Sequence, residues 1–234
     1  MSLGNISRRK CFYRLSVFTS SLLFLNDVCA GGQLEEPLAD SVRSALSAAI
    51  ANSEPPVLEF ADTPSRVAYL RWLTDKNDQL RRYKTELQAR TEFLQTLWYE
   101  ARRAGLDVHL VLGLVQVESA FRKFAVSVVG ARGYMQIMPF WSRLIGDGDA
   151  AKLFHMQTNL RFGCVILRHY LDRENGNLFM ALGRYNGSRG KAEYPAAVLA
   201  AARKWGYTGR ERSAVQSGDR PDSLAPPVFS QPTA

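Results

Sequence analysis

The chain has 234 residues, of which 46% are apolar, and its 30 basic and 22 acidic side chains give a formal net charge of +8. A chain of this length and composition buries one ordinary hydrophobic core, so we expect one compact domain with tails. The charge favours acidic partners without choosing among them. Because the basic residues are spread along the sequence without interleaved aromatic residues, nucleic-acid binding is not expected.

The first thirty residues have the layout of a signal peptide. Four basic residues precede an uncharged run, Leu15–Leu25, that is too short to span a bilayer as a helix. Val28-Cys29-Ala30 then supplies small residues at the spacing that a signal peptidase reads. We therefore expect residues 1–30 to be a signal peptide and the mature, exported chain to begin near Gly31. The alternative is an apolar N-terminal helix of the fold.

Cleavage at this point leaves 26 basic and 21 acidic residues, a net charge of +5, and only one of the three cysteines, Cys164. An intramolecular disulfide and thiolate metal clusters are thereby excluded. Cys164 lies in an apolar helical pattern and is expected to be buried rather than nucleophilic. The three histidines show no metal-ligand spacing with acids, so no metal and no cofactor is expected. No later apolar stretch is long enough for a membrane span, and no stable membrane insertion is expected.

Residues 31–63 combine prolines with acidic and small residues, which is typical of a leader or linker, with a short helix over Ser41–Ala51. From Pro64, apolar residues recur at three- and four-residue spacings with charges on the other face. This pattern predicts an N-terminal helical arm that ends near Gly105. The arm is either one long helix or two helices broken near 75–78.

Asp107 is suited to cap a new helix that runs to about Ala120. Its residues 110–117 leave almost no polar face, which predicts a buried helix with Glu118 at its C-terminal end. An irregular loop over Arg122–Gly133 is expected to follow, because glycine and serine turn signals interrupt it.

Helical patterns resume at Pro139 to Ile145, at 157–170 and at Leu178–Leu182. After Tyr207 the chain is rich in serine, proline, aspartate and glycine, so residues 208–234 are expected to form a disordered tail. We predict an all-α domain over 64–207 with its core at 92–207.

Glu118 has the surroundings of a general acid. Splitting an acetal requires a proton on the leaving oxygen, and a carboxyl group supplies it near neutral pH only if its pKa is raised, as burial among apolar residues does. The alternative is an exposed glutamate at a helix end. No Asp or Glu occurs from Ser119 to Gly146, so a second carboxylate would have to come from a more distant residue: Asp147, Asp149, Asp172 or Glu174.

Three blocks of sequence carry a specific resemblance: Glu118-Ser119, the segment from Gly130 to Pro139, and the segment from Arg184 to Gly187. In order and spacing they resemble the signature blocks of the soluble lytic murein transglycosylase catalytic domain (the SLT, lysozyme-like family) over about 92–207. The resemblance implies an all-α, lysozyme-like helical domain. It also implies cleavage of the MurNAc–GlcNAc β-1,4 bond of peptidoglycan without water, which leaves 1,6-anhydroMurNAc ends.

The resemblance also implies roles for individual residues. Glu118 would be the single catalytic acid and then the base, followed by Ser119 in the family's Glu-Ser pair. Ser127 matches a serine that faces the substrate's acetamido group. Tyr185 would hold its hydroxyl group toward Glu118, and Asn186 would fix the turn and the groove wall.

Met135 and Gln136 would line the saccharide groove, with Gln136 bonding the sugar and Met135 packing on it. Taken singly, each block has a structural alternative, since glycines form turns and methionine fills cores. The sequence departs from the family at Tyr134, Val128 and Arg184, where leucine, proline and a small residue are usual. These changes bear on subsite preference.

The implied partner is the peptidoglycan glycan strand, with a cell-envelope machinery as a further candidate, and the implied location is the periplasm of a Gram-negative-type bacterium. Two other functions stay open. A muramidase would use a remote aspartate to activate water, and a non-catalytic module would only bind peptidoglycan. Cleavage at strand ends or within strands, and the biological role, are not determined by the sequence.

Overall fold

The computed structural model describes residues 32–51, 58 and 60–209, and these form an all-α molecule, which confirms the predicted class. The predicted signal peptide, and the predicted tail from residue 210 onward, lie outside the described residues. The helices, with the short 3-10 helix η1, are α1 (Asp40–Ala51), α2 (Thr63–Leu80), α3 (Leu87–Arg103), α4 (Val108–Ser119), α5 (Pro139–Ile145), η1 (Ala150–Phe154), α6 (Met156–Arg173), α7 (Leu178–Asn186) and α8 (Glu193–Trp205).

Side-chain caps explain where several helices begin. The Asp107 carboxylate accepts hydrogen bonds from the His109 and Leu110 amides at 2.7 and 2.9 Å, which confirms the predicted cap of α4. Asp62 caps α2 and Asn177 caps α7 in the same way. The caps satisfy amide groups that have no partner within their own helix.

The helical arm breaks after Leu80 rather than near 75–78. Asn77 donates from its side chain to the Leu73 carbonyl one turn back, so this polar stretch stays helical. Leu80 is fully buried and its carbonyl accepts two turn hydrogen bonds. The Arg90 guanidinium then donates to the carbonyls of Lys84 and Thr85 and fixes the connection to α3.

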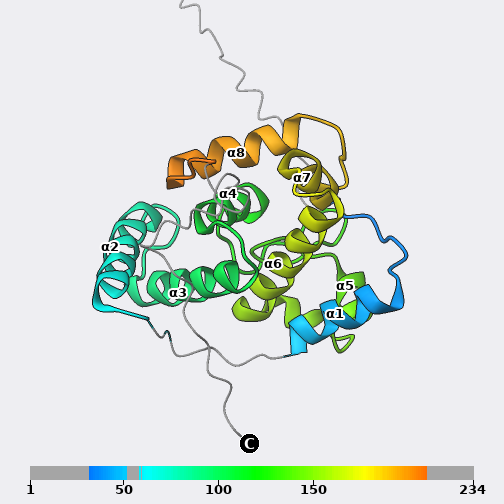
Figure 1. Ribbon diagram of the computed structural model, residues 1–234, viewed down its shortest axis with the longest axis horizontal. Coiled ribbons are helices and arrows are strands. Elements are labelled where there is room, and N and C mark those ends of the chain that lie inside the picture. Colours follow the sequence, from blue (N-terminus) through cyan, green and yellow to red (C-terminus); the bar gives the residue numbers. More distant parts are fainter. Residues whose placement is uncertain (1–31, 52–57, 59, 210–234) are drawn as a thin grey trace, which may run out of the picture.

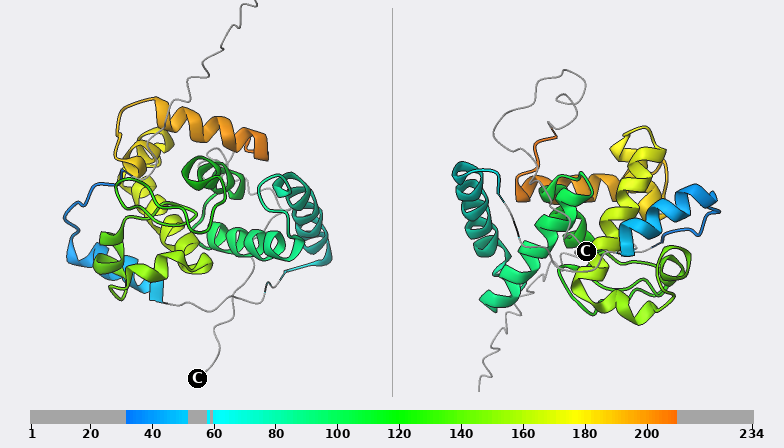
Figure 2. Two further views of the ribbon diagram at one scale, coloured as in Figure 1. Left: turned by 180° about the vertical axis from the view of Figure 1, so that it is seen from behind. Right: turned by 60° about the horizontal axis from the view of Figure 1, so that its bottom comes forward.

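The buried helix α4 lies between α8 and α3 (Figure 1). Its contact with α8 is close because Gly113 faces Ala202, where an added Cβ would lie 2.5 Å from the Ala202 nitrogen. Helices α3 and α6 are joined by a fully buried ion pair in which Arg161 donates to Glu100 at 2.7 Å. The α1–α5 pair lies at the opposite end of the molecule from α2 (Figure 2).

Two features of the fold differ from the sequence-based predictions. Helix α8 was not predicted, because Pro195 interrupts the pattern, yet proline is tolerated in a first helical turn. Residues 32–51 were expected to be a leader or linker, but α1 packs against α5 and α6. Leu46 is buried there, and Arg103 donates to the Ala49 carbonyl at 2.6 Å.

Candidate active site

Glu118 lies in the last turn of α4, among the buried residues of this helix. The helix stops abruptly because Ala120 and Phe121 both have positive φ angles, of 47° and 62°. Such angles are unfavourable for residues other than glycine and persist only where packing imposes them. Here the Phe121 ring is buried against Phe93 and Trp205. The end of α4, and with it Glu118, is thereby held in place.

The Glu118 side chain is buried, with 5% of the residue exposed, so the alternative of an exposed glutamate is wrong. Burial raises the pKa of its carboxyl group to about 8, and a hydrogen bond from Tyr194 partly opposes this rise. The Tyr194 hydroxyl donates to Oε1, while Oε2 has no hydrogen-bond partner among the described residues. This raised pKa favours the protonated form of the carboxyl group at neutral pH.

Tyr194 donates a hydrogen bond to Glu118, and Tyr185, which was expected to hold its hydroxyl group toward Glu118, lies near enough for Glu118 to raise its pKa. The Tyr185 hydroxyl donates instead to the Met135 carbonyl at 2.8 Å, because its ring is fully buried between α7 and the loop after α4. Tyr194 was missed together with α8. Its signal was the spacing of Tyr194, Val198 and Trp205, which lie on the buried face of that helix.

Ser119 and Tyr185 fasten the loop that follows α4. Ser119 Oγ donates to the Tyr134 carbonyl at 2.7 Å, next to the Met135 carbonyl that Tyr185 binds. These two residues of the predicted site therefore act by positioning backbone, and Ser119 is itself buried.

Met135 and Gln136 are buried within this loop and do not face a groove. The Met135 side chain packs against Gly163 of α6, where an added Cβ would lie 2.2 Å from its sulfur atom. Gln136 is 2% exposed, and its Nε2 donates to the carbonyls of Ala125 and Gly133 at 3.1 and 2.9 Å. The sugar contacts expected for this pair stay a prediction.

Asn159 of α6 holds the same loop and was not singled out in the sequence. Its Oδ1 accepts from the Met135 amide at 2.8 Å, and its Nδ2 donates to the carbonyls of Arg132 and Leu153 at 2.8 and 2.7 Å. Gly133 lies against Asn159 so closely that a Cβ would come within 2.4 Å.

Ser127 and Asn186 are both half-buried. The Ser127 Oγ accepts from the Ala131 amide at 3.1 Å, which closes the turn of its loop. Asn186 donates to Ser188 at 3.1 Å, while its Oδ1 is buried without a partner among the described residues. Asn186 follows Tyr185 in the chain. Burial raises the pKa of Tyr185 most, and the nearby Glu118 is the second cause.

A known family model matches the part of the chain that contains these residues. Residues 96–199 match the family model described as the transglycosylase SLT domain. The chain carries a transglycosylase SLT domain. The matched residues run from α3 into α8 and include Glu118, Tyr185 and Tyr194.

Several relatives resemble this SLT domain in sequence. A transglycosylase of Enterobacteria phage PRD1 is 33% identical over 105 residues, covering 45% of this chain and 38% of the relative. The membrane-bound lytic murein transglycosylase C of Haemophilus influenzae (strain PittEE) is 41% identical over 120 residues, covering 45% and 33%. That of Actinobacillus pleuropneumoniae serotype 5b (strain L20) is 36% identical over 90 residues, covering 35% and 24%. The matches thus span well under half the length of these relatives.

Among solved structures, an inactive mutant of the lytic transglycosylase Slt from Pseudomonas aeruginosa is similar to this chain. The sequence identity is 26%, the TM-score is 0.45, and the match covers 61% of this chain and 29% of the other.

No second carboxylate contributes to the raised pKa of Glu118 among the residues that the structure describes. Each of the distant acids has a partner of its own. Asp147 pairs with Lys152, Asp149 caps η1, Asp172 pairs with Arg168 at 2.6 Å and Glu174 pairs with Arg184 at 2.6 Å. These four acids are thus each engaged with a group other than Glu118.

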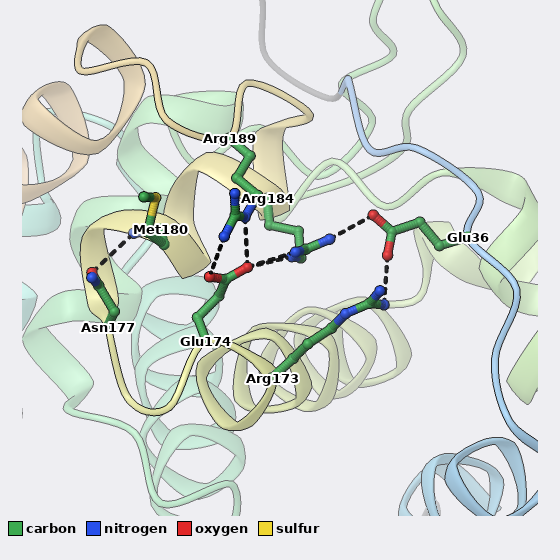
Figure 3. A network of polar contacts seen from close by, with 7 residues as sticks. All are labelled: Glu36, Arg173, Glu174, Asn177, Met180, Arg184 and Arg189. Atoms are coloured by element: carbon green, nitrogen blue, oxygen red, sulfur yellow. Dashed lines mark hydrogen bonds and ion pairs between the residues drawn. The ribbon is translucent and has the colours of Figure 1, made fainter.

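The three departures from the family pattern have different surroundings in the SLT domain. The Tyr134 hydroxyl accepts from Lys84 at 2.9 Å, and Val128 is 95% exposed at the tip of its loop. Arg184 lies between two carboxylates, those of Glu174 and Glu36 (Figure 3).

Neither a metal cluster nor a membrane helix is found in the described ranges. No three His, Cys, Asp or Glu side chains there gather as a metal site would require. None of the helices in those ranges combines the length and apolar character needed to cross a bilayer.

Proposed function

We propose that this chain is a peptidoglycan lytic transglycosylase and that Glu118 is its catalytic residue. The observation that carries the proposal is the burial of the Glu118 carboxyl group, which raises its pKa, in a region that matches the SLT domain, with no second carboxylate among the described residues that contributes to this pKa. A lone neutral acid suits a reaction that protonates a leaving group and needs no carboxylate nucleophile or base.

The reaction proceeds in two steps. Glu118 gives its proton to the oxygen that links N-acetylmuramic acid to N-acetylglucosamine, and the bond from C1 of the muramic residue to this oxygen breaks. The substrate's own N-acetyl oxygen stabilises the positive charge at C1. Ionised Glu118 then takes the proton of the muramic C6 hydroxyl as O6 bonds to C1, which yields the 1,6-anhydro end and restores the acid without consuming water.

The other residues of the site have supporting roles in this proposal. Tyr194 holds Oε1 of Glu118 and leaves Oε2 to face the leaving oxygen. Ser127 offers its half-buried hydroxyl group to the acetamido group of the glycan, and Asn186 offers its Oδ1 to a glycan hydroxyl group once this buried atom is uncovered. Ser119 and Tyr185 position the loop that borders the site.

The test is mass spectrometry of purified peptidoglycan digested in water enriched in oxygen-18. A transglycosylase leaves anhydromuramic ends without the label, whereas a muramidase leaves reducing muramic ends that carry it. The variant Glu118→Gln should abolish release of fragments. The matched control is Glu193→Gln, which removes the same charge from an exposed residue beside Tyr194 and should act like the parent. Undiminished activity of Glu118→Gln would exclude Glu118 as the acid.

We also propose export, with residues 1–30 as the signal peptide and the periplasm as the place of action. Relatives of the SLT domain are named membrane-bound lytic murein transglycosylases, which supports action on the cell wall. N-terminal sequencing of the protein recovered from the periplasm should give a first residue near Gly31. Recovery of an uncleaved chain from the cytoplasm would contradict export.

A further inference from the structure

The residues that precede α1 cross the edge of the site. We call Gly32–Glu36 the strap. Its first residue lies against the end of α7, where an added Cβ on Gly32 would come 2.6 Å from the Asn186 carbonyl oxygen. A Cβ on Gly187 would come 1.9 Å from the Gly32 oxygen, so the two backbones touch.

Gln33 carries the strap from α7 to the loop before α5. It is 3% exposed, and its Oε1 accepts from the Met138 amide at 3.3 Å. Its side chain also faces the Tyr185 hydroxyl group, which is close to Glu118. The strap therefore runs from the end of α7, at Asn186 and Gly187, to Met138 just before α5.

Glu36 fastens the strap to two arginines (Figure 3). Its carboxylate pairs with Arg184 at 2.7 Å and with Arg173 at 2.5 Å. Arg184 is held in place by Glu174, which also binds Arg189, so the docking site for Glu36 does not depend on the strap. Arg184 is also one of the three positions at which the sequence departs from the family pattern, which usually has a small residue there.

Access to Glu118 requires a movement. Its Oε2 is buried, yet the leaving oxygen of a glycan must come within hydrogen-bond distance of it for proton transfer. The strap is held by the Glu36 ion pairs, one hydrogen bond to Met138 and packing at α7. The Gln33 side chain also interacts with the Tyr185 hydroxyl group in the closed position. The strap is thus easier to displace than the helices of the core.

We propose that the strap is an autoinhibitory segment, latched by Glu36 onto Arg173 and Arg184, which a glycan strand must displace from its place beside Tyr185 and Asn186. This inference rests on the proposed function. The apparent affinity for glycan is then reduced by the fraction of molecules in which the strap is open, and a weaker latch raises this fraction.

The experiment compares Glu36→Gln with Glu35→Gln in the full chain as purified. Both variants remove one negative charge from the strap, but Glu35 pairs only at 3.6 Å with Arg143, and both of these side chains are more than half exposed. Hydrogen exchange of the Met138 amide reports strap opening, and KM for purified glycan strands reports its effect on turnover. Glu36→Gln should speed the hydrogen exchange of the Met138 amide about fivefold and lower KM about fivefold, and kcat should stay unchanged. Glu35→Gln should match the parent.

A second variant opens the strap by a different route. Gly32→Ala removes the space beside the Asn186 carbonyl and should reproduce the effects of Glu36→Gln. Faster exchange with an unchanged or raised KM would overturn autoinhibition, and unchanged exchange in both variants would overturn the latch.

A failure of the proposed function can be distinguished from a failure of the proposal that the strap is autoinhibitory. If the parent protein releases no fragments from peptidoglycan, the strap is judged by binding instead. Glycan strands should bind Glu118→Gln about fivefold more tightly when Glu36→Gln is added. Equal affinity with and without Glu36→Gln would overturn the proposal.

Discussion

Replacing Glu118 by glutamine tests the burial of the carboxyl group without any assay of activity. The folded chain holds the Glu118 proton up to a pKa of about 8, whereas the ordinary value is 4.5. Below pH 4.5 both the folded and the unfolded chain carry the proton, so burial has no pH-dependent cost. As the pH rises from 4.5 toward 8, only the unfolded chain loses its proton, and the free energy of unfolding falls.

The size of this effect follows from the two pKa values. Each unit of pH between them removes up to about 1.4 kcal/mol, which amounts to about 2 to 3 kcal/mol between pH 5 and pH 7. Glutamine does not titrate, so Glu118→Gln should lack this loss. Any cost from the buried amide of glutamine is the same at every pH and cancels in the comparison.

The assay is urea unfolding of the parent and of Glu118→Gln at pH 5, 6 and 7. The stability of the variant relative to the parent should rise by about 2 to 3 kcal/mol over this range. Glu193→Gln, at an exposed position, should follow the parent. A constant difference between Glu118→Gln and the parent would refute the argument that burial keeps Glu118 protonated.

Three further substitutions test the surroundings of the site. Tyr194→Phe removes a hydrogen bond that lowers the Glu118 pKa, so the alkaline limb of the pH profile of kcat/KM should move to higher pH and kcat should fall about tenfold; an unmoved limb would count against the contact. Asn159→Ala removes the partner of the buried Met135 amide and of the Leu153 carbonyl, while the Arg132 carbonyl keeps its bond from the Ile137 amide, and should cost about 2 to 3 kcal/mol in urea unfolding; an unchanged midpoint would contradict this role. Gly113→Ala puts a methyl group 2.5 Å from the Ala202 nitrogen and should cost about 1 to 3 kcal/mol in thermal unfolding; a stability equal to the parent's would show that α4 and α8 are less closely packed.

Local sequence patterns predicted much of the fold. The Asp107 cap, the apolar α4 and the helix that starts at Pro139 all depend on interactions within a few residues, which a sequence displays directly. The buried position of Glu118 followed from the same apolar run. Helix α8 was missed because Pro195 obscured a pattern that only its packing against α4 makes stable.

The residues around Glu118 depend on distant parts of the chain. Met135 and Gln136 belong to a sequence block whose resemblance implies sugar contacts. In the structure both side chains are buried, because Asn159 binds the Met135 amide and Gly163 of α6 leaves space for the Met135 side chain. Whether a side chain faces a groove or the core is decided by the elements that close over it, which a motif does not include.

The sequence by itself determined an all-α chain with one acid at the end of an apolar helix, because helix periodicity and capping are local properties. Only the tertiary structure decided that Tyr194 rather than Tyr185 contacts this acid, and that Glu36 reaches Arg184 across the molecule. Such contacts join residues far apart in the chain, and their partners are fixed by how the helices pack.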